Sequence, residues 1–186
     1  MKNYDFRFSN ELFQSFVGKQ FNKYKHYRFI VTNSVSQCVG IMIDGISYEM
    51  RNDYEPLDYF GWDSEATVSS FAGRDWNEIL SAYPEDIVTE EVNAIIESII
   101  IVNDHFSSFC HGECNYDYWE TRSVIFKFKN HELHFAKEDC WFSMVILIDT
   151  GTNLIDKVPD GKEILEDFEQ SDEQRIEVNR EIIVFK

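Results

Sequence analysis

Residues 38–50 read Cys-Val-Gly-Ile-Met-Ile-Asp-Gly-Ile-Ser-Tyr-Glu-Met, and no other stretch of the chain indicates a local structure so clearly. Two runs rich in β-branched and apolar side chains flank the pair Asp44-Gly45. A type I′ turn needs positive φ at both of its central residues, and Asp-Gly meets that need at low cost. The stretch therefore predicts a β-hairpin.

Three other parts of the chain also predict strands. Residues 124–129 and 132–135 alternate aromatic or aliphatic with polar side chains around Asn130-His131, which predicts a second hairpin with one buried and one solvated face. Residues 141–148 are apolar almost throughout, a pattern typical of a strand that is covered on both faces and lies inside a sheet. Residues 181–185 predict a closing strand.

Apolar side chains at helical spacing predict helices between these strands. Ser9 or Asn10 is a candidate N-cap, and apolar residues then follow the 3.6-residue period as far as Tyr24. Thr89 is a second candidate N-cap, because two glutamates that suit the positive end of a helix dipole follow it. The isoleucine-rich end of that segment also fits a strand. The expected helices cover residues 10–24, 75–82, 89–106 and 162–168.

Together these segments predict an α+β fold, with a mostly antiparallel sheet of about 6–7 strands and helices packed mainly on one face. Residues 52–76 look irregular. The sequence contains no internal repeat and no low-complexity linker, so we expect residues 1–186 to form a single domain.

The net charge of the chain is −17, from 17 basic and 34 acidic side chains. Residues 51–100 alone hold two basic and twelve acidic side chains. Such a field repels phosphate backbones and attracts cationic proteins. We therefore expect no direct binding of nucleic acid. We expect a basic protein as partner, unless the acidity serves solubility alone.

The N-terminal residues and the cysteines bear on localisation. Residues 1–7 carry charges and no apolar run typical of a secretory signal, and no apolar stretch approaches the ~20 residues that span a bilayer. Four cysteines without such a signal fit free thiols in a reducing compartment. We expect a cytoplasmic, bacterial type of protein with no membrane contact.

Two histidines and two cysteines crowd into one segment, as His105, Cys110, His111 and Cys114. These residue types bind zinc, but zinc sites favour paired ligands separated by a longer loop. A thiol nucleophile at Cys110 with His111 as base is also disfavoured, because neighbouring side chains point apart. We expect neither a metal nor another cofactor, although the spacing does not exclude metal binding by these four residues.

No catalytic signature is present, whether a glycine-rich nucleotide loop, a nucleophile elbow or a zincin helix. Paired carboxylates are too abundant to be specific, since general acid–base work needs one of them in an apolar pocket. We therefore expect a protein that is not an enzyme. The alternative is an enzyme with a site dispersed in sequence, for which the candidates are His105, His111, His131, His134 and nearby carboxylates.

Aromatic and acidic side chains mix in two segments that we expect to be loops. Aromatic anchors supply much of the energy in protein interfaces, and flanking charges set partner choice and association rate. The opposite interpretation is that the rings fold inward as core. The candidate partner-binding residues are Tyr54, Glu55, Asp58, Tyr59, Trp62 and Asp63 in the first segment, and Tyr116, Asp117, Tyr118, Trp119 and Glu120 in the second.

In size, acidity and lack of catalytic motifs the chain resembles the small acidic immunity proteins that bacteria produce with toxins of contact-dependent and other polymorphic systems. The resemblance is one of general profile, and no family motif matches individual residues. It implies that the protein blocks a basic, nuclease-like toxin domain by contact. The alternative within the same class is a phage-type inhibitor that presents carboxylates where an enzyme expects phosphates.

Overall fold

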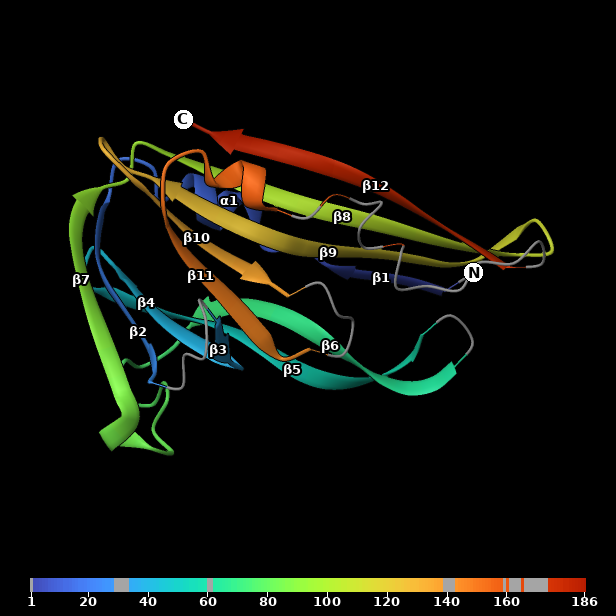
Figure 1. The fold of residues 1–186 in the computed structure, drawn as a ribbon, viewed down its shortest axis with the longest axis horizontal. Coiled ribbons are helices and arrows are strands. Elements are labelled where there is room, and N and C mark those ends of the chain that lie inside the picture. Colours follow the sequence, from blue (N-terminus) through green and yellow to red (C-terminus); the bar gives the residue numbers. More distant parts are fainter. Residues whose placement is uncertain are drawn as a thin grey trace.

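The computed structural model describes the backbone of residues 2–28, 34–59, 62–138, 143–158, 160, 165 and 174–186, and their side chains except those of 34, 36, 56–59, 62–66 and 174. Most of this part of the chain is extended, and the strands form two sheets that meet along one side of the molecule (Figure 1).

The larger sheet, sheet A, has seven strands. Six follow the order β12-β8-β9-β10-β11-β3, and β1 pairs with β9 in parallel, whereas the other pairs are antiparallel. Its strands are β1 (Lys2–Phe6), β3 (Ser34–Ser36), β8 (Ser98–Cys110), β9 (Glu113–Lys127), β10 (Glu132–Lys137), β11 (Val145–Gly151) and β12 (Gln174–Phe185).

The smaller sheet, sheet B, has five antiparallel strands in the order β6-β5-β4-β2-β7. Its strands are β2 (Gln20–Tyr27), β4 (Cys38–Ile43), β5 (Ile46–Tyr59), β6 (Trp62–Gly73) and β7 (Ile87–Ile95). The short 3-10 helix η1 (Pro84–Asp86) leads into β7, and a second one, η2 (Leu154–Lys157), follows β11.

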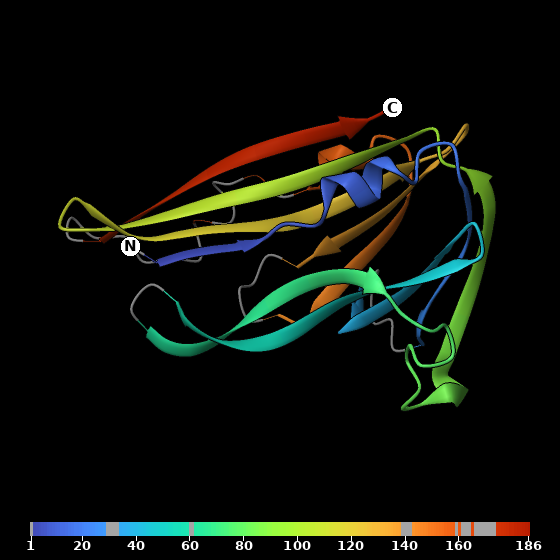
Figure 2. The ribbon, with the colours of Figure 1, turned by 180° about the vertical axis from the view of Figure 1, so that it is seen from behind.

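The prediction of an α+β fold is therefore wrong, because the described chain is mostly β and its strands form two sheets. The only α-helix whose bounds the described residues define is α1 (Asn10–Gln14). No layer of helices covers a sheet face in this part of the molecule (Figure 2).

Both predicted hairpins are confirmed. β4 and β5 pair around Asp44 and Gly45, whose φ angles of 48° and 75° are the positive values that the turn requires. β9 and β10 pair around Asn130-His131, but the predicted solvated face is wrong, because all six residues of β10 are buried. β11 lies between β10 and β3, as expected of a strand inside a sheet, but it is not covered on both faces, because only Ile146 of its residues is buried. Residues 141 and 142 fall outside the described residues. The closing strand is also present and is longer than predicted, as β12.

Two of the four predicted helices, residues 75–82 and 89–106, are not found, and the first is much shorter than predicted. The first stops at Gln14, and after Gly18, whose φ is 81°, the chain continues as strand β2. Residues 75–82 form turns, and residues 89–106 form parts of β7 and β8. The fourth, 162–168, lies outside the described residues except at position 165. Residues 52–76, expected to be irregular, form most of the long β5–β6 hairpin.

The main hydrophobic core lies between the two sheets and includes the aromatic residues of α1. Phe13 packs against Phe126 of sheet A and Phe71 of sheet B, with ring centroids 6.2 and 4.8 Å apart. Phe16 meets Tyr48 of β5 edge to face at 5.0 Å. The helix therefore acts as an aromatic wedge that joins the two sheets at one end.

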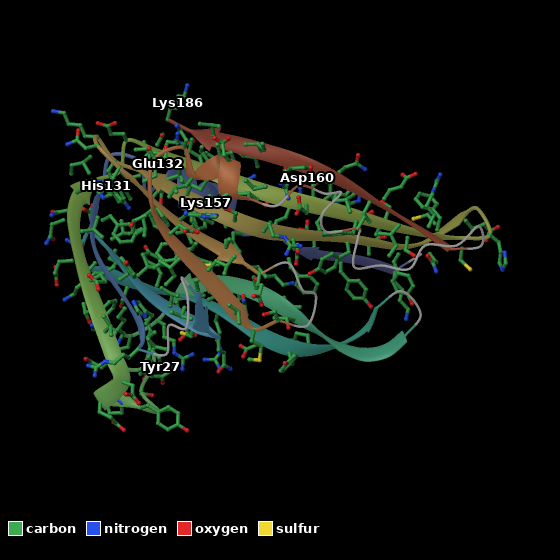
Figure 3. All side chains as sticks on the ribbon, viewed as in Figure 1. Tyr27, His131, Glu132, Lys157, Asp160 and Lys186 are labelled. Carbon is green, nitrogen blue, oxygen red and sulfur yellow. The ribbon has the colours of Figure 1, made fainter. Side chains whose placement is uncertain are left out.

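A second apolar layer covers the opposite face of sheet A, where Leu154 of η2 packs on the β8–β9 ladder. Glu132 anchors η2 by accepting a hydrogen bond from the backbone N–H of Leu154 at 2.7 Å, and it pairs with Lys127 at 2.8 Å (Figure 3). Burial disfavours the ionised carboxylate, but these two partners outweigh that effect and lower the pKa of Glu132.

Candidate functional site

The first predicted aromatic–acidic segment is the outer part of the β5–β6 hairpin rather than a loop. Its backbone pairs Asp58 with Asp63 and Tyr59 with Trp62, whose side chains lie outside the described residues. Tyr54 is 50% exposed and Glu55 is also exposed. These last two predicted residues therefore lie on the surface.

The second segment is also not a loop, because residues 116–120 lie in the middle of β9. Side chains alternate between the two faces of a strand, so this segment is divided. Tyr116, Tyr118 and Glu120 are buried, at 7%, 2% and 0% exposure. Asp117 and Trp119 lie on the opposite face and are partly exposed. Three of the five residues therefore belong to the interior.

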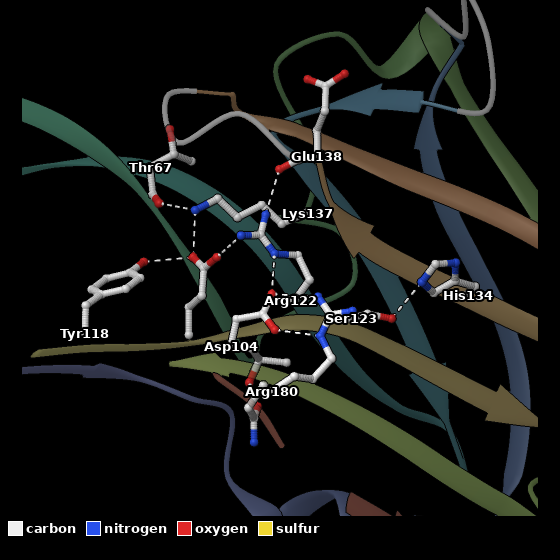
Figure 4. Close-up of polar contacts among 12 residues, drawn as sticks. Thr67, Asp104, Tyr118, Arg122, Ser123, His134, Lys137, Glu138 and Arg180 are labelled. Carbon is white, nitrogen blue, oxygen red and sulfur yellow. Dashed lines mark hydrogen bonds and ion pairs between the residues drawn. The ribbon is translucent and has the colours of Figure 1, made fainter. Parts of the chain in front are cut away.

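Glu120 belongs to a largely buried network of charges (Figure 4). Glu120 lies where the neighbour of β9 changes from β1 to β10. Its carboxylate accepts hydrogen bonds from Tyr118 and Lys137, both at 2.8 Å, and pairs with Arg122 Nη2 at 2.5 Å. Lys137 Nζ also donates to the carbonyl oxygen of Thr67 in β6, at 2.8 Å. The network thus ties sheet A to sheet B.

Asp104 completes this network on the neighbouring strand β8. It accepts a hydrogen bond from Arg122 Nε at 3.2 Å and two from Arg180 of β12, at 2.7 and 2.9 Å. Burial disfavours the charge on Glu120, but the cations of Arg122 and Lys137 outweigh this and lower its pKa. With its charges turned toward one another, the network is a structural element rather than a binding site for an ionic ligand.

His105 and Trp119 form an ordered cluster on the opposite face of β8 and β9. Their rings stack at 4.1 Å, His105 Nε2 contacts Asp117, and the Arg7 guanidinium lies 4.4 Å from the Trp119 ring centroid. In the described residues, Cys110 is separate from this cluster at the β8–β9 turn, and no group of three or more His, Cys, Asp or Glu is placed to hold a metal ion.

Among the described residues, the segment with the most uniform charge on the surface is 75–97, which we call the acidic edge. This segment contains seven acidic residues and no Lys, Arg or His. It comprises η1, the edge strand β7 of sheet B and the turns before them. All but Asp86 of its acidic side chains are exposed, and Asp86 is half-buried: Asp75, Glu78, Glu85, Asp86, Glu90, Glu91 and Glu97.

Cations of neighbouring segments neutralise the acidic edge only in part. Arg74 lies 3.8 Å from Glu78, and Lys23 of β2 lies 3.8 Å from Glu91. Lys25 is buried and turned toward Trp76, whose carbonyl oxygen accepts its ammonium hydrogen bond at 2.5 Å. Among the described residues, the carboxylates of the remaining acids of β7 and its flanks form no ion pair: Asp75, Glu85, Asp86, Glu90 and Glu97.

Aromatic side chains lie within and beside the acidic edge, near the start of β7. Tyr83 is 59% exposed and meets Tyr27 edge to face, with ring centroids 6.0 Å apart. Tyr27 is the cross-strand partner of Ile87, at the end of sheet B where β7 begins (Figure 3). A ring beside unpaired carboxylates is the combination expected of a surface that binds cationic groups.

Within the part of the chain whose side chains are described, the negative excess is not stored in the interior. The buried cations there are Lys25, Arg122 and Lys137, and the buried acids are Glu49, Asp104, Glu120 and Glu132. These charges nearly cancel. Most of the negative excess of the described side chains therefore lies on exposed or half-buried residues, where it acts on approaching molecules.

Comparison of the chain with protein-family models, curated proteins and solved structures gives no significant match. No helix in the described part of the chain is long and apolar enough to cross a bilayer.

The acidic excess of this region is visible in the sequence, but the spacing of its apolar residues predicts a helix where the structure has the edge strand β7. The charge count located the acidic excess in residues 51–100, which include the edge. Glu90 and Glu91 were assigned to a helix N-terminus, however, whereas they are neighbours on the edge strand β7. Alternation puts adjacent residues on opposite faces of the strand, so carboxylates flank this edge on both sides.

Proposed function

We propose that the protein is an acidic binding module that neutralises a cationic protein partner. The observation that carries this proposal is the acidic edge, where seven acidic residues without an intervening cation lie on the edge strand β7 of sheet B and in the segments that flank it. A one-signed, solvated surface of this kind accelerates encounter with an oppositely charged protein and repels nucleic acid.

The profile of the small acidic immunity proteins supports a narrower version of the proposal. In that version the partner is a basic, nuclease-like toxin domain whose active site the protein covers by contact. A nuclease must present cations to the phosphate backbone, and the carboxylates of the acidic edge are suited to such a surface.

The test is a titration with the purified product of the neighbouring gene, as an inactivated toxin domain, at 50 and 500 mM salt. The edge variant E85Q/E90Q/E97Q removes three carboxylates without ion-pair partners. Its matched control, E11Q/E113Q/D156N, changes the net charge equally at three exposed positions elsewhere. We expect the edge variant to bind at least tenfold more weakly with a shallower salt dependence, and the control to change affinity less than threefold.

Two outcomes would contradict this proposal. Equal losses in the two variants would show that only net charge matters, and that the acidic edge is not the contact surface. The absence of binding to the neighbouring product and to basic nuclease domains in general would remove the binding function itself.

A further inference from the structure

The outer side of β7 carries backbone groups without a neighbouring strand. Within the described residues β7 pairs only with β2, and it forms the end of sheet B (Figures 1 and 2). A strand edge of this kind is a template for another extended chain, because it presents a row of N–H and C=O groups.

The register of β7 shows which of these groups point outward. Arg28 N–H donates to the Asp86 carbonyl oxygen at 2.6 Å, so this pair is of the hydrogen-bonded type. Such pairs alternate with pairs whose N–H and C=O groups point away from the partner strand. Continuing the register, the outward-facing residues are Ile87, Thr89 and Glu91. The N–H of Ile87 already donates to the Pro84 carbonyl oxygen at the end of η1, so Ile87 offers only its C=O, whereas Thr89 and Glu91 offer both groups.

The charge of β7 indicates which kind of extended segment can pair with this edge. The edge strand of sheet A, β12, carries both signs, with Arg175 paired to Glu177 at 2.7 Å. β7 carries Glu90 and Glu91 and no cation. A second copy of the protein would bring a further charge of −17 and would be repelled. A segment rich in lysine or arginine would be attracted.

We propose that β7 binds an extended, lysine- or arginine-rich segment of the partner as a sixth strand of sheet B. This inference rests on the proposed function and adds the mode of contact. Because Glu90 and Glu91 lie on opposite faces of β7, the incoming strand places two consecutive cations beside them. Its backbone bonds to the C=O of Ile87 and to the N–H and C=O groups of Thr89 and Glu91.

The direct test uses a synthetic peptide, Val-Thr-Val-Lys-Lys-Val-Thr-Val, and the same peptide with two central glutamates. At 50 mM salt we expect the lysine peptide to bind and to slow amide hydrogen exchange at Thr89 and Glu91. The glutamate peptide should not bind. Failure of the lysine peptide to bind, or binding without protection at these two amides, overturns the proposal.

A matched pair of variants separates backbone pairing from charge. Thr89→Pro removes one outward N–H and keeps every carboxylate, and proline is tolerated on edge strands where the N–H faces solvent. Thr89→Ala keeps the N–H. We expect T89P to weaken peptide binding about tenfold or more, the effect of losing one or two hydrogen bonds, and T89A to change it less than threefold. Equal affinities contradict strand addition.

The same pair distinguishes this inference from the proposed function. If the toxin domain binds wild type, T89A and T89P equally, yet binds the edge variant E85Q/E90Q/E97Q weakly, strand addition is wrong and the acidic edge remains the contact surface. If T89P fails to fold, the exchange measurement on the wild-type protein still decides the question.

Discussion

At the scale of single residues, His134 illustrates how the interior of sheet A constrains a titratable group. The side chain is 1% exposed, and its Nε2 lies 2.6 Å from the Ser123 hydroxyl. Burial disfavours the imidazolium, and Asp149 at 3.6 Å offsets this only in part, so the pKa of His134 falls to about 4. The ring is therefore neutral in the folded protein above that pH.

This lowered pKa predicts a pH-dependent stability. The unfolded chain binds a proton at His134 near pH 6.5, whereas the folded protein resists protonation until about pH 4. Stability present above pH 6.5 is thus lost as the pH falls through that window. Between pH 7 and pH 5 we expect wild type to lose about 1–2 kcal/mol more than His134→Gln, in urea unfolding. Parallel losses in the two proteins would show that His134 titrates normally.

The buried residues also show what the sequence could not reveal about the candidate site. Tyr116, Tyr118 and Glu120 looked like interface residues because aromatic and acidic types mix there. Burial of Glu120 depends on Arg122, two positions away, and on Lys137, which reaches it from another strand. A pairing with a residue so distant in sequence is set by sheet register, which one sequence does not display.

At the scale of elements, the residues of the Asp44-Gly45 turn correctly predicted a hairpin, whereas apolar side chains at helical spacing wrongly predicted helices. The β4–β5 turn follows from Asp44 and Gly45 alone. The expected helix at 89–106 failed because β7 contains an irregularity, with Asn93 at a φ of 49°, that shifts the alternation of its side chains. β8 then buries consecutive residues, since Ile99 faces the main core and Ile100 faces η2. Both effects imitate helical spacing.

The packing of β2 against β4 explains why a glycine stands at position 40. Lys25 is 4% exposed, and its ammonium lies 4.5 Å from the Trp76 ring centroid. Burial lowers the pKa of this lysine. A Cβ on Gly40 would lie 2.9 Å from Lys25 Cγ and 3.2 Å from Ile79 Cγ2. Because Trp76 holds the ammonium group of Lys25, the aliphatic carbons of the lysine side chain have little freedom to move away from a methyl group at position 40.

We therefore predict that Gly40→Ala destabilises the protein by about 1–3 kcal/mol, the usual cost of overpacking a core. Gly73→Ala is the control, since Gly73 is also a strand residue and a Cβ there meets nothing within 4 Å. It should change the free energy of unfolding by less than about 1 kcal/mol. Urea unfolding of both variants measures the difference. A mild effect at position 40 would mean that Lys25 is free to move.

At the scale of the whole molecule, the distribution of negative charge lowers the stability of the folded state. Among the described side chains the buried charges nearly cancel, so their negative excess lies on exposed and half-buried residues, and the acidic edge concentrates part of it in residues 75–97. Like charges close together destabilise the compact state and are screened by salt. In the acidic edge five of the seven carboxylates form no ion pair with any described residue, so this cluster costs stability and is more readily explained by binding than by folding.

Because these carboxylates repel one another, we predict that the edge variant E85Q/E90Q/E97Q is more stable than wild type in the absence of any partner. At 20 mM salt we expect it to be about 0.5–1 kcal/mol more stable than wild type, because self-repulsion is relieved, and at 500 mM salt the gain should largely vanish. The control E11Q/E113Q/D156N should gain less, since Glu11 and Asp156 lie in the first turns of α1 and η2, where a negative charge is favourable. Urea unfolding at the two salt concentrations measures both. An edge variant less stable than wild type at low salt would show that these carboxylates serve the fold, and the case for a binding surface on β7 would lose its energetic support.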